Sequence, residues 1–317
     1  MAGEGNILIA DESALFALLH SDMGRRVESA GAIGNPLLAC ASSTECLSAF
    51  NVRNPLYGPP PIALLVKRAE DRRVTDAIVS RYTTVTLPPR SFFELRDGLF
   101  MASPELVYCR MASQVSVYQL AKIGTDLCGR YYIDPHTETI GTRTRFLTFP
   151  EQLRAFIDSI GSARGVAKAR TALRWILPNS GSPEETNMQL LLRLPLSRGG
   201  FNLPFSAMNY AVLPGRLSAL ANQSSYSIDL ANPRLKIGVE YDGAAYHLDQ
   251  SADKRRRNDL KALGWDIFPI DKSVLYDARA TVNVADQLAK SIGVRLRKQP
   301  SWEEKYLRLR SDLDLPC

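Results

Sequence analysis

Three acidic residues and one histidine follow one another closely in the second half of the chain. Asp229 lies in "YSIDLA", Glu240 and Asp242 lie in "KIGVEYDGAAYH", and that stretch ends at His247. Side chains alternate between faces along a strand, so Glu240 and Asp242 share a face and Asp229 can lie on the same side of the sheet. Carboxylates gathered on one face repel one another unless a divalent cation lies between them or they extend into water.

Two interpretations therefore stay open for this hairpin. It is either a solvated polar face or a site for a hard ion, Mg²⁺ or Mn²⁺, which prefers oxygen ligands. A two-residue turn at Asn232 and Pro233 would place Asp229 opposite Lys236, and Glu240 would then lie roughly 13 Å along the partner strand. The metal site thus requires a shifted register, a bulge or diverging strands.

The elements that would position these residues form a compact series. Ser182, Pro183 and Glu185 suit the N-cap, first and capping-box positions of a helix. The hydrophobic periodicity then predicts strands, a charged helix, a further strand and a last helix, which is the order of a mixed α/β core. The expected elements are helix 182–194, strands 208–213, 226–231 and 235–242, helix 251–264, strand 265–270 and helix 280–292.

This ordered set resembles the PD-(D/E)XK nuclease superfamily, in its very-short-patch-repair (Vsr) endonuclease-like branch, over about residues 180–295. The matching features are "SPEET" at the helix start, "SIDLANPRLKIGVEYDGAAYH" and "DKRRRNDLKALGWDIFPI". Each feature is weak alone, but their order is fairly specific. The resemblance implies a restriction-endonuclease-like mixed sheet flanked by helices, and Mg²⁺-dependent phosphodiester cleavage.

The resemblance also implies roles for individual residues. Asp229 corresponds to the metal-binding aspartate, with Ile228 where the superfamily has proline. Glu240 corresponds to the acid of the (D/E)XK element, and Asp242 stands where the superfamily lysine would be, which removes the usual cation. The main-chain carbonyl of Tyr241 would complete the metal shell.

Two further residues take roles from the resemblance, each beside a simpler interpretation. His247 would transfer a proton, or it is a hydrogen-bonded core residue. Glu185 would be an outer carboxylate of the site, or it only closes the capping box of its helix.

Four consecutive basic residues after the expected strand 235–242 suggest a contact with nucleic acid. At least one of them would contact the phosphate backbone of DNA. The alternative for Arg257 is an ion pair within the fold. The run consists of Lys254, Arg255, Arg256 and Arg257.

Bulk properties limit the class of protein. The 317 residues carry a formal net charge of +6 and a sequence pI of about 9.1, which permits a nucleic-acid partner without requiring one. No secretory signal and no membrane-length apolar run are visible. The five cysteines are scattered and form no CxxC pair, so neither zinc nor a disulfide framework is expected, and the cytoplasm is the expected location.

The order of strand and helix patterns in the first half of the sequence predicts a separate α+β domain. The turn cluster "PNSGS" separates it from the nuclease-like part, so the expected domains are 1–177, 178–298 and a C-terminal tail, 299–317. Residues 102–132 resemble bacterial proteins associated with AbiEi-type antitoxins. DNA recognition, binding of a protein partner and positioning of the nuclease stay open as roles of the first domain. The expected elements are helices 11–20, 111–124, 149–160 and 163–177 and strands 62–67, 83–88, 98–103 and 128–134.

Two functions from different classes follow. The first is a metal-dependent DNA endonuclease or nicking enzyme, with RNA as a further possible substrate. The second is an inactive nuclease fold that binds DNA or protein as a regulator in a toxin–antitoxin setting, because fold does not fix function.

Overall fold

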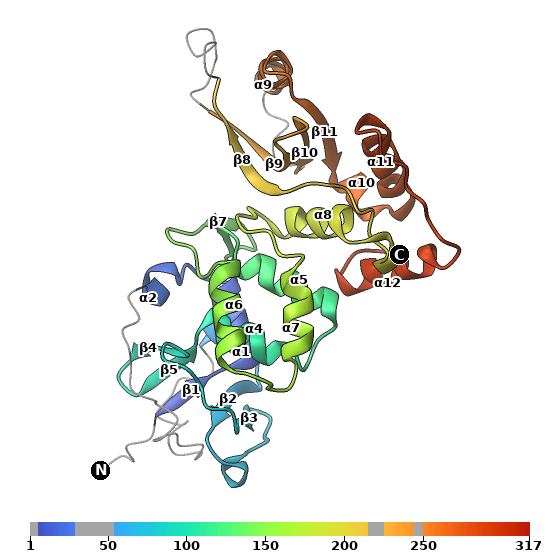
Figure 1. Cartoon of the computed structure of the whole chain (residues 1–317). Coiled ribbons are helices and arrows are strands. Elements are labelled where there is room, and N and C mark those ends of the chain that lie inside the picture. The colour runs from blue at the N-terminus through green and yellow to red at the C-terminus, as the bar shows by residue number, and fades with distance from the viewer. Residues whose placement is uncertain (1–5, 29–53, 215–224, 244–249) are drawn as a thin grey trace. The chain divides into compact units, whose positions relative to one another are not determined.

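The computed structural model describes residues 6–28, 54–214, 225–243 and 250–317. The chain divides into two compact units, Met1–Ile176 and Leu177–Cys317. Each unit combines helices with its own sheet, so the chain is mixed α/β as expected (Figure 1). No helix in the described ranges has the length and apolar character that a membrane crossing needs.

The first unit is built on a five-stranded mixed sheet of order β3-β2-β1-β5-β4. The pairs β1–β5 and β2–β3 are parallel, whereas β1–β2 and β4–β5 are antiparallel. A short antiparallel hairpin, β6–β7, lies apart from this sheet. The strands are β1 (Ile7–Ile9), β2 (Ile62–Val66), β3 (Ile78–Tyr82), β4 (Phe92–Arg96), β5 (Leu99–Ala102), β6 (Tyr131–Ile133) and β7 (Ile140–Thr142).

The helices of the first unit differ from the expectation in two places. The expected helix 111–124 is interrupted: a turn follows the first of two helices, and Ser116 caps the second through its bond to the Gln119 N–H. Asp11, the first residue of the expected helix 11–20, makes no capping bond and forms buried ion pairs instead. The helices are α1 (Asp11–Leu19), α2 (Gly24–Glu28), α4 (Pro104–Met111), α5 (Val117–Leu127), α6 (Pro150–Ser159) and α7 (Val166–Leu173), with 3₁₀ turns Pro55–Tyr57 and Ala69–Asp71.

The second unit carries a four-stranded sheet of order β11-β10-β9-β8. The pairs β8–β9 and β9–β10 are antiparallel and β10–β11 is parallel, so the sheet is mixed. The strands are β8 (Ala207–Val212), β9 (Tyr226–Asn232), β10 (Ile237–Asp242) and β11 (Asp266–Asp271). The helices are α8 (Pro183–Arg193), α9 (Gln250–Ala262), α10 (Lys272–Tyr276), α11 (Ala278–Ser291) and α12 (Trp302–Asp312), with the 3₁₀ turn Leu196–Arg198.

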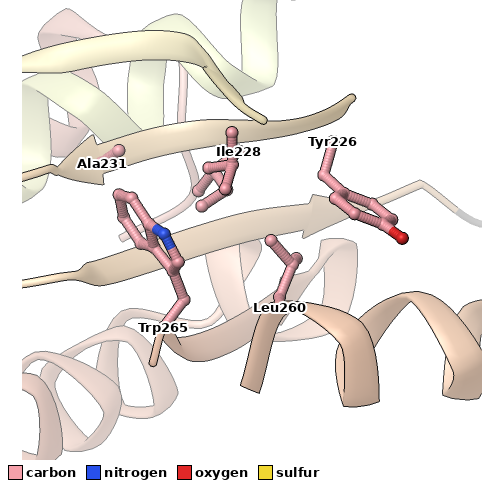
Figure 2. Close-up of a cluster of buried hydrophobic side chains, with 6 residues drawn as sticks. Tyr226, Ile228, Ala231, Leu260 and Trp265 are labelled. Carbon is pink, nitrogen blue, oxygen red and sulfur yellow. The ribbon is translucent and has the colours of Figure 1, made fainter. Parts of the chain in front are cut away.

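Helix α9 covers one face of this sheet through an apolar cluster. Leu260 of α9 and Trp265, which follows the helix, point towards Tyr226 and Ile228 of β9 (Figure 2). Trp265 is 6% exposed and belongs to the core of the second unit. The cluster fixes α9 beside the strands that carry the acidic residues.

The face pattern of the strands is not the simple alternation that was expected. Ile228 and Ala231 both belong to the α9 cluster, although residues three apart on a regular strand lie on opposite faces. The β8–β9 ladder skips one position, at Asn209 and Asp229, and Asn209 has a φ of +45°. The regular alternation of side chains is therefore interrupted at the acid itself.

The face of β10 that carries Gly238 is apolar beside this residue. A Cβ built on Gly238 would come within 2.5 Å of Ile228 Cγ2 and 2.9 Å of Ile267 Cδ1. Both of those side chains belong to the apolar layer under α9. The missing side chain at Gly238 thus makes room for the core.

The expected C-terminal tail, 299–317, is a packed part of the second unit. Helix α12 within it has Trp302 stacked on Tyr306, with ring centroids 4.9 Å apart and near Phe201. Arg310 is fully buried and donates hydrogen bonds to the carbonyls of Leu275 and Tyr276. The contacts with Phe201, Leu275 and Tyr276 join the segment to residues before position 299.

Candidate functional site

The candidate site lies where strands β9 and β10 separate. The antiparallel ladder between them ends at the pair Leu230–Val239, although both strands continue. Beyond that pair, β9 is bonded to β8 and β10 to β11. Asp229 and Glu240 are the next residue on each strand, so both acids stand at the start of the opening.

The hairpin register brings the two acids to matching positions. Asn232 pairs with Ile237, so the turn consists of the four residues 233–236 rather than two. Asp229 therefore does not lie opposite Lys236. The structure combines a shifted register with diverging strands, two of the three conditions that would allow a shared site.

Asp229 spans the opening between the two strands. Its Oδ2 accepts a 2.8 Å hydrogen bond from the main-chain N–H of Tyr241, on the other strand. Burial raises the pKa of Asp229 to about 6; the Tyr241 N–H opposes this rise, the charge of Glu240 adds to it and Arg256 opposes it. The carboxyl is thus held in a place where its charge is costly without a cation.

One carboxylate oxygen of Glu240 is paired with an arginine, and the other has no hydrogen-bond donor among the described residues. Its Oε2 accepts a 2.6 Å hydrogen bond from Arg256 Nη1, in an ion pair whose side chains are 13% and 27% exposed. Arg256 also donates from Nη2 to the carbonyl of Ser227. Glu240 Oε1 is buried and accepts no hydrogen bond from any residue in the described ranges. Such an oxygen costs about 1–3 kcal/mol if nothing satisfies it, so it suits a cation or a water molecule.

Glu185 approaches the same acids from helix α8. Its Oε2 accepts hydrogen bonds from the Gly181 N–H, at 2.8 Å, and from Asn209 Nδ2, at 2.7 Å. Burial raises the pKa of Glu185 to about 8, and the charge of Asp229 adds to the rise; the two hydrogen bonds oppose it. Charge therefore links Glu185 to Asp229 and Asp229 to Glu240.

The start of helix α8 follows the expected capping pattern only in part. Ser182 Oγ accepts a 3.1 Å hydrogen bond from the Glu185 N–H, as an N-cap does. The reciprocal bond of a capping box is replaced, because the Glu185 carboxylate takes the N–H of Gly181 instead. The capping-box interpretation of the Glu185 side chain is therefore wrong.

Asn209 is a member of this network that sequence reasoning missed. Its amide donates to Glu185 and, at 2.9 Å, to the carbonyl of Asn179. The available signal was an asparagine inside a strand pattern, a residue type depleted in strands. Asn209 adopts its positive φ more readily than a residue with a β-branched side chain.

We expect Asn209→Ala to lower the free energy of unfolding by about 1–3 kcal/mol, because Glu185 loses a donor and alanine must adopt a positive φ. Urea unfolding followed by tryptophan fluorescence measures the change. Asn209→Gly is the matched control, since it removes the amide but relieves the backbone. An alanine variant as stable as the wild type would contradict the inferred role of Asn209.

Three predicted site residues remain, and the structure describes Asp242 and Tyr241 but not His247. Asp242 is half-buried at the end of β10, and no described side chain holds its carboxylate. The Tyr241 main chain takes part through its N–H, which binds Asp229. His247 lies outside the described residues.

The four basic residues of α9 divide into two kinds. Lys254, Arg255 and Arg257 are exposed. Arg256 is turned towards the sheet, where it binds Glu240. The structure thus separates one cation at the acids from three on the helix surface.

The residues present are compatible with a Mg²⁺ or Mn²⁺ ion. In the described part of the chain, no three or more His, Cys, Asp or Glu side chains form a ready metal site. Mg²⁺ usually keeps several waters and takes only one or two carboxylates together with substrate phosphates. Asp229, with its raised pKa, and Glu240, with its unsatisfied Oε1, suit that ligand pattern.

Comparison of the chain with protein-family models, with curated proteins and with solved structures found no match in any of the three.

Proposed function

We propose that the second unit is a metal-dependent nuclease of the PD-(D/E)XK type, similar to the Vsr endonuclease-like branch, and that it hydrolyses phosphodiester bonds in DNA. The observation that carries the proposal is the pair Asp229 and Glu240 at the point where β9 and β10 separate. Glu185 supports it, because its pKa is raised partly by the charge of Asp229. Buried carboxyl groups with raised pKa values, such as Asp229 and Glu185, are typical of functional sites.

Asp229 and Glu240 would hold the ion, and the main-chain carbonyl of Tyr241 would add a ligand. A bound Mg²⁺ supplies an electrophile for the phosphoryl oxygens and lowers the pKa of a water molecule. Asp229 is kept in place by the Tyr241 N–H. Glu185 acts as an outer carboxylate, and Asp242 as a further acid at the strand end. His247 would transfer a proton, since its usual pKa lies near neutral pH.

Helix α9 would contact the DNA. Lys254, Arg255 and Arg257 are exposed on it and suit phosphate contacts, whose contribution decreases with salt. Arg256 is assigned a separate role, because its guanidinium already binds Glu240. We propose that Arg256 orients Glu240 rather than the DNA backbone.

A second candidate function rests on the same ion pair. Arg256 occupies one Glu240 oxygen, and Asp242 stands where the superfamily has its lysine. If Arg256 keeps that oxygen from a metal ion, the second unit would be an inactive nuclease fold. Such a fold would serve a regulator by binding DNA or a protein partner. The two candidates differ in a single property, which is turnover.

Nicking of supercoiled plasmid by the purified full chain tests the proposal. We expect open-circular product with Mg²⁺ or Mn²⁺ and none with a chelator. A chain carrying both Asp229→Ala and Glu240→Ala, purified identically, excludes a contaminating nuclease. If the wild type binds DNA but never nicks it with either metal, the enzyme proposal fails and the regulator is supported.

A further inference from the structure

We propose that a groove in the first unit binds a single strand of nucleic acid, through its phosphates and one stacked base. The groove joins two hollows of about 720 and 520 Å³ that share Arg81 and Tyr82. Leu106 and Cys109 of α4 lie along it and are almost fully buried. This site belongs to a different unit from the acids and does not depend on cleavage.

The charge of the groove favours an anionic ligand. Four arginines line it, and no acidic residue of the described ranges does. Arg72 and Arg164 are exposed, and neither forms an ion pair with a described acid. Phosphates bound by such cations displace counterions, which makes the binding salt-dependent. The four arginines are Arg72, Arg81, Arg110 and Arg164.

The other two arginines are fixed by two acids that do not line the groove. Arg110 binds both carboxylate oxygens of Asp11, at 2.5 and 2.8 Å, and Asp11 is fully buried. Arg81 binds Asp11 at 3.1 Å and both oxygens of Glu12. These ion pairs hold the side chains of Arg81 and Arg110 in place along the groove. The same two acids offset the positive charge of these arginines. Most of the electrostatic affinity is then expected from Arg72 and Arg164.

An exposed aromatic ring lies where the two hollows meet. Tyr82, the last residue of edge strand β3, is 41% exposed. The Arg72 guanidinium carbon lies 5.5 Å from the centre of its ring. An aromatic ring beside cations is the arrangement on which single-stranded nucleic acids stack their bases. An acidic peptide offers the negative charge but no base for this ring.

Local packing holds the position of Arg164. The next residue, Gly165, has a φ of +91°, and a Cβ there would lie 3.0 Å from the Ala112 carbonyl carbon and the Ser113 nitrogen. Lys168 Nζ donates a 2.6 Å hydrogen bond to the carbonyl of Val115. The turn that carries Arg164 is thus tied to the end of α4, and the groove exists before a ligand arrives.

Fluorescence anisotropy of a labelled single-stranded oligonucleotide tests this inference. The full chain is titrated in EDTA at several salt concentrations, so that no metal-dependent cleavage interferes. The double variant Arg72→Gln, Arg164→Gln should bind about tenfold more weakly, with a reduced slope of log affinity against log salt. Tyr82→Ser should weaken binding by about fivefold or more at every salt concentration, with an unchanged slope.

Arg154→Gln is the matched control, because Arg154 is exposed on α6 outside the groove and should bind as the wild type does. Circular dichroism confirms that each variant is folded. The inference is overturned if the groove variants keep wild-type affinity and slope, or if polyglutamate competes as well as an oligonucleotide of equal charge. A chain that binds through the groove but never nicks plasmid leaves this inference standing while the nuclease proposal fails.

Discussion

The Asp229→Asn variant is expected to lose metal-dependent cleavage, by a hundredfold or more, yet to be at least as stable as the wild type without metal. Loss of one metal-binding carboxylate removes on the order of several kcal/mol of transition-state stabilisation. Asparagine still offers an oxygen to the Tyr241 N–H, so the contact across the opening can remain. The uncharged amide also removes a buried charge that the fold tolerates poorly.

The expected gain in stability follows from the raised pKa of Asp229, about 6 against a usual value of 3.8. Holding this carboxyl ionised at pH 8 costs the folded state about 1–3 kcal/mol. The variant should recover a part of that free energy in urea unfolding at pH 8. Residues that serve a site at the expense of stability commonly behave in this way.

Asp266→Asn provides the control for this prediction. Asp266 is an exposed acid at the start of β11, where it accepts a 3.2 Å hydrogen bond from Ser291. This substitution changes the net charge equally, so plasmid nicking and unfolding at pH 8 should both remain near wild type. Full cleavage by Asp229→Asn would remove Asp229 from the proposed metal site.

The element order of the second unit could be predicted because its signals are local. The hydrophobic periodicity and the capping residues predicted seven elements, all of which are present. They are α8, β8, β9, β10, α9, β11 and α11. The N-cap at Ser182 is present because it needs only the residues that follow it. Contacts within a few residues along the chain are what a sequence pattern records.

The errors occur where distant contacts decide the structure. Residues 83–88, which are rich in threonine, form no strand, whereas Ile78–Tyr82 forms one because it pairs with β2. Helix α12 stands where only a tail was expected, and it packs against Phe201, far along the chain. Propensity is a weak guide when tertiary contacts compete with it.

The site shows the same division. Strand alternation brought Asp229 and Glu240 into consideration, and the resemblance to PD-(D/E)XK nucleases added Glu185. The ion pair of Glu240 with Arg256 and the support from Asn209 were beyond reach, because they join segments whose approach depends on register and helix placement. The interrupted alternation likewise coincides with the position at Asn209 and Asp229 that the ladder between β8 and β9 skips.

Without metal, the second unit should become less stable as pH rises from about 4 to 8. The folded-state pKa values of Asp229 and Glu185, about 6 and about 8, lie above their usual values of 3.8 and 4.5. Between these limits the folded chain binds more protons than the unfolded chain, so stability decreases with increasing pH. The contribution is complete below the usual values and is lost as pH passes through the folded ones.

Urea unfolding at pH 5, 6, 7 and 8, followed by tryptophan fluorescence, measures this slope, because Trp265 and Trp302 both report on the second unit. A group that binds one proton more in the folded state contributes about 1.4 kcal/mol per pH unit. Glu185→Gln should reduce the slope throughout this range and leave little of it above pH 6, where Asp229 is already ionised in the folded chain and Glu185 alone contributes. Asp266→Asn should leave it unchanged.

Mg²⁺ should reverse this trend, because metal ligands must be deprotonated to bind. Added Mg²⁺ is expected to stabilise the wild type more at pH 8 than at pH 6, by an amount that increases with the ratio of its concentration to its Kd. The same titration with Asp229→Asn should show little stabilisation at either pH. Metal-free stability that rises from pH 5 to 8 would mean that these carboxyls are not held at raised pKa. An equal Mg²⁺ effect in the wild type and Asp229→Asn would place the ion elsewhere on the chain.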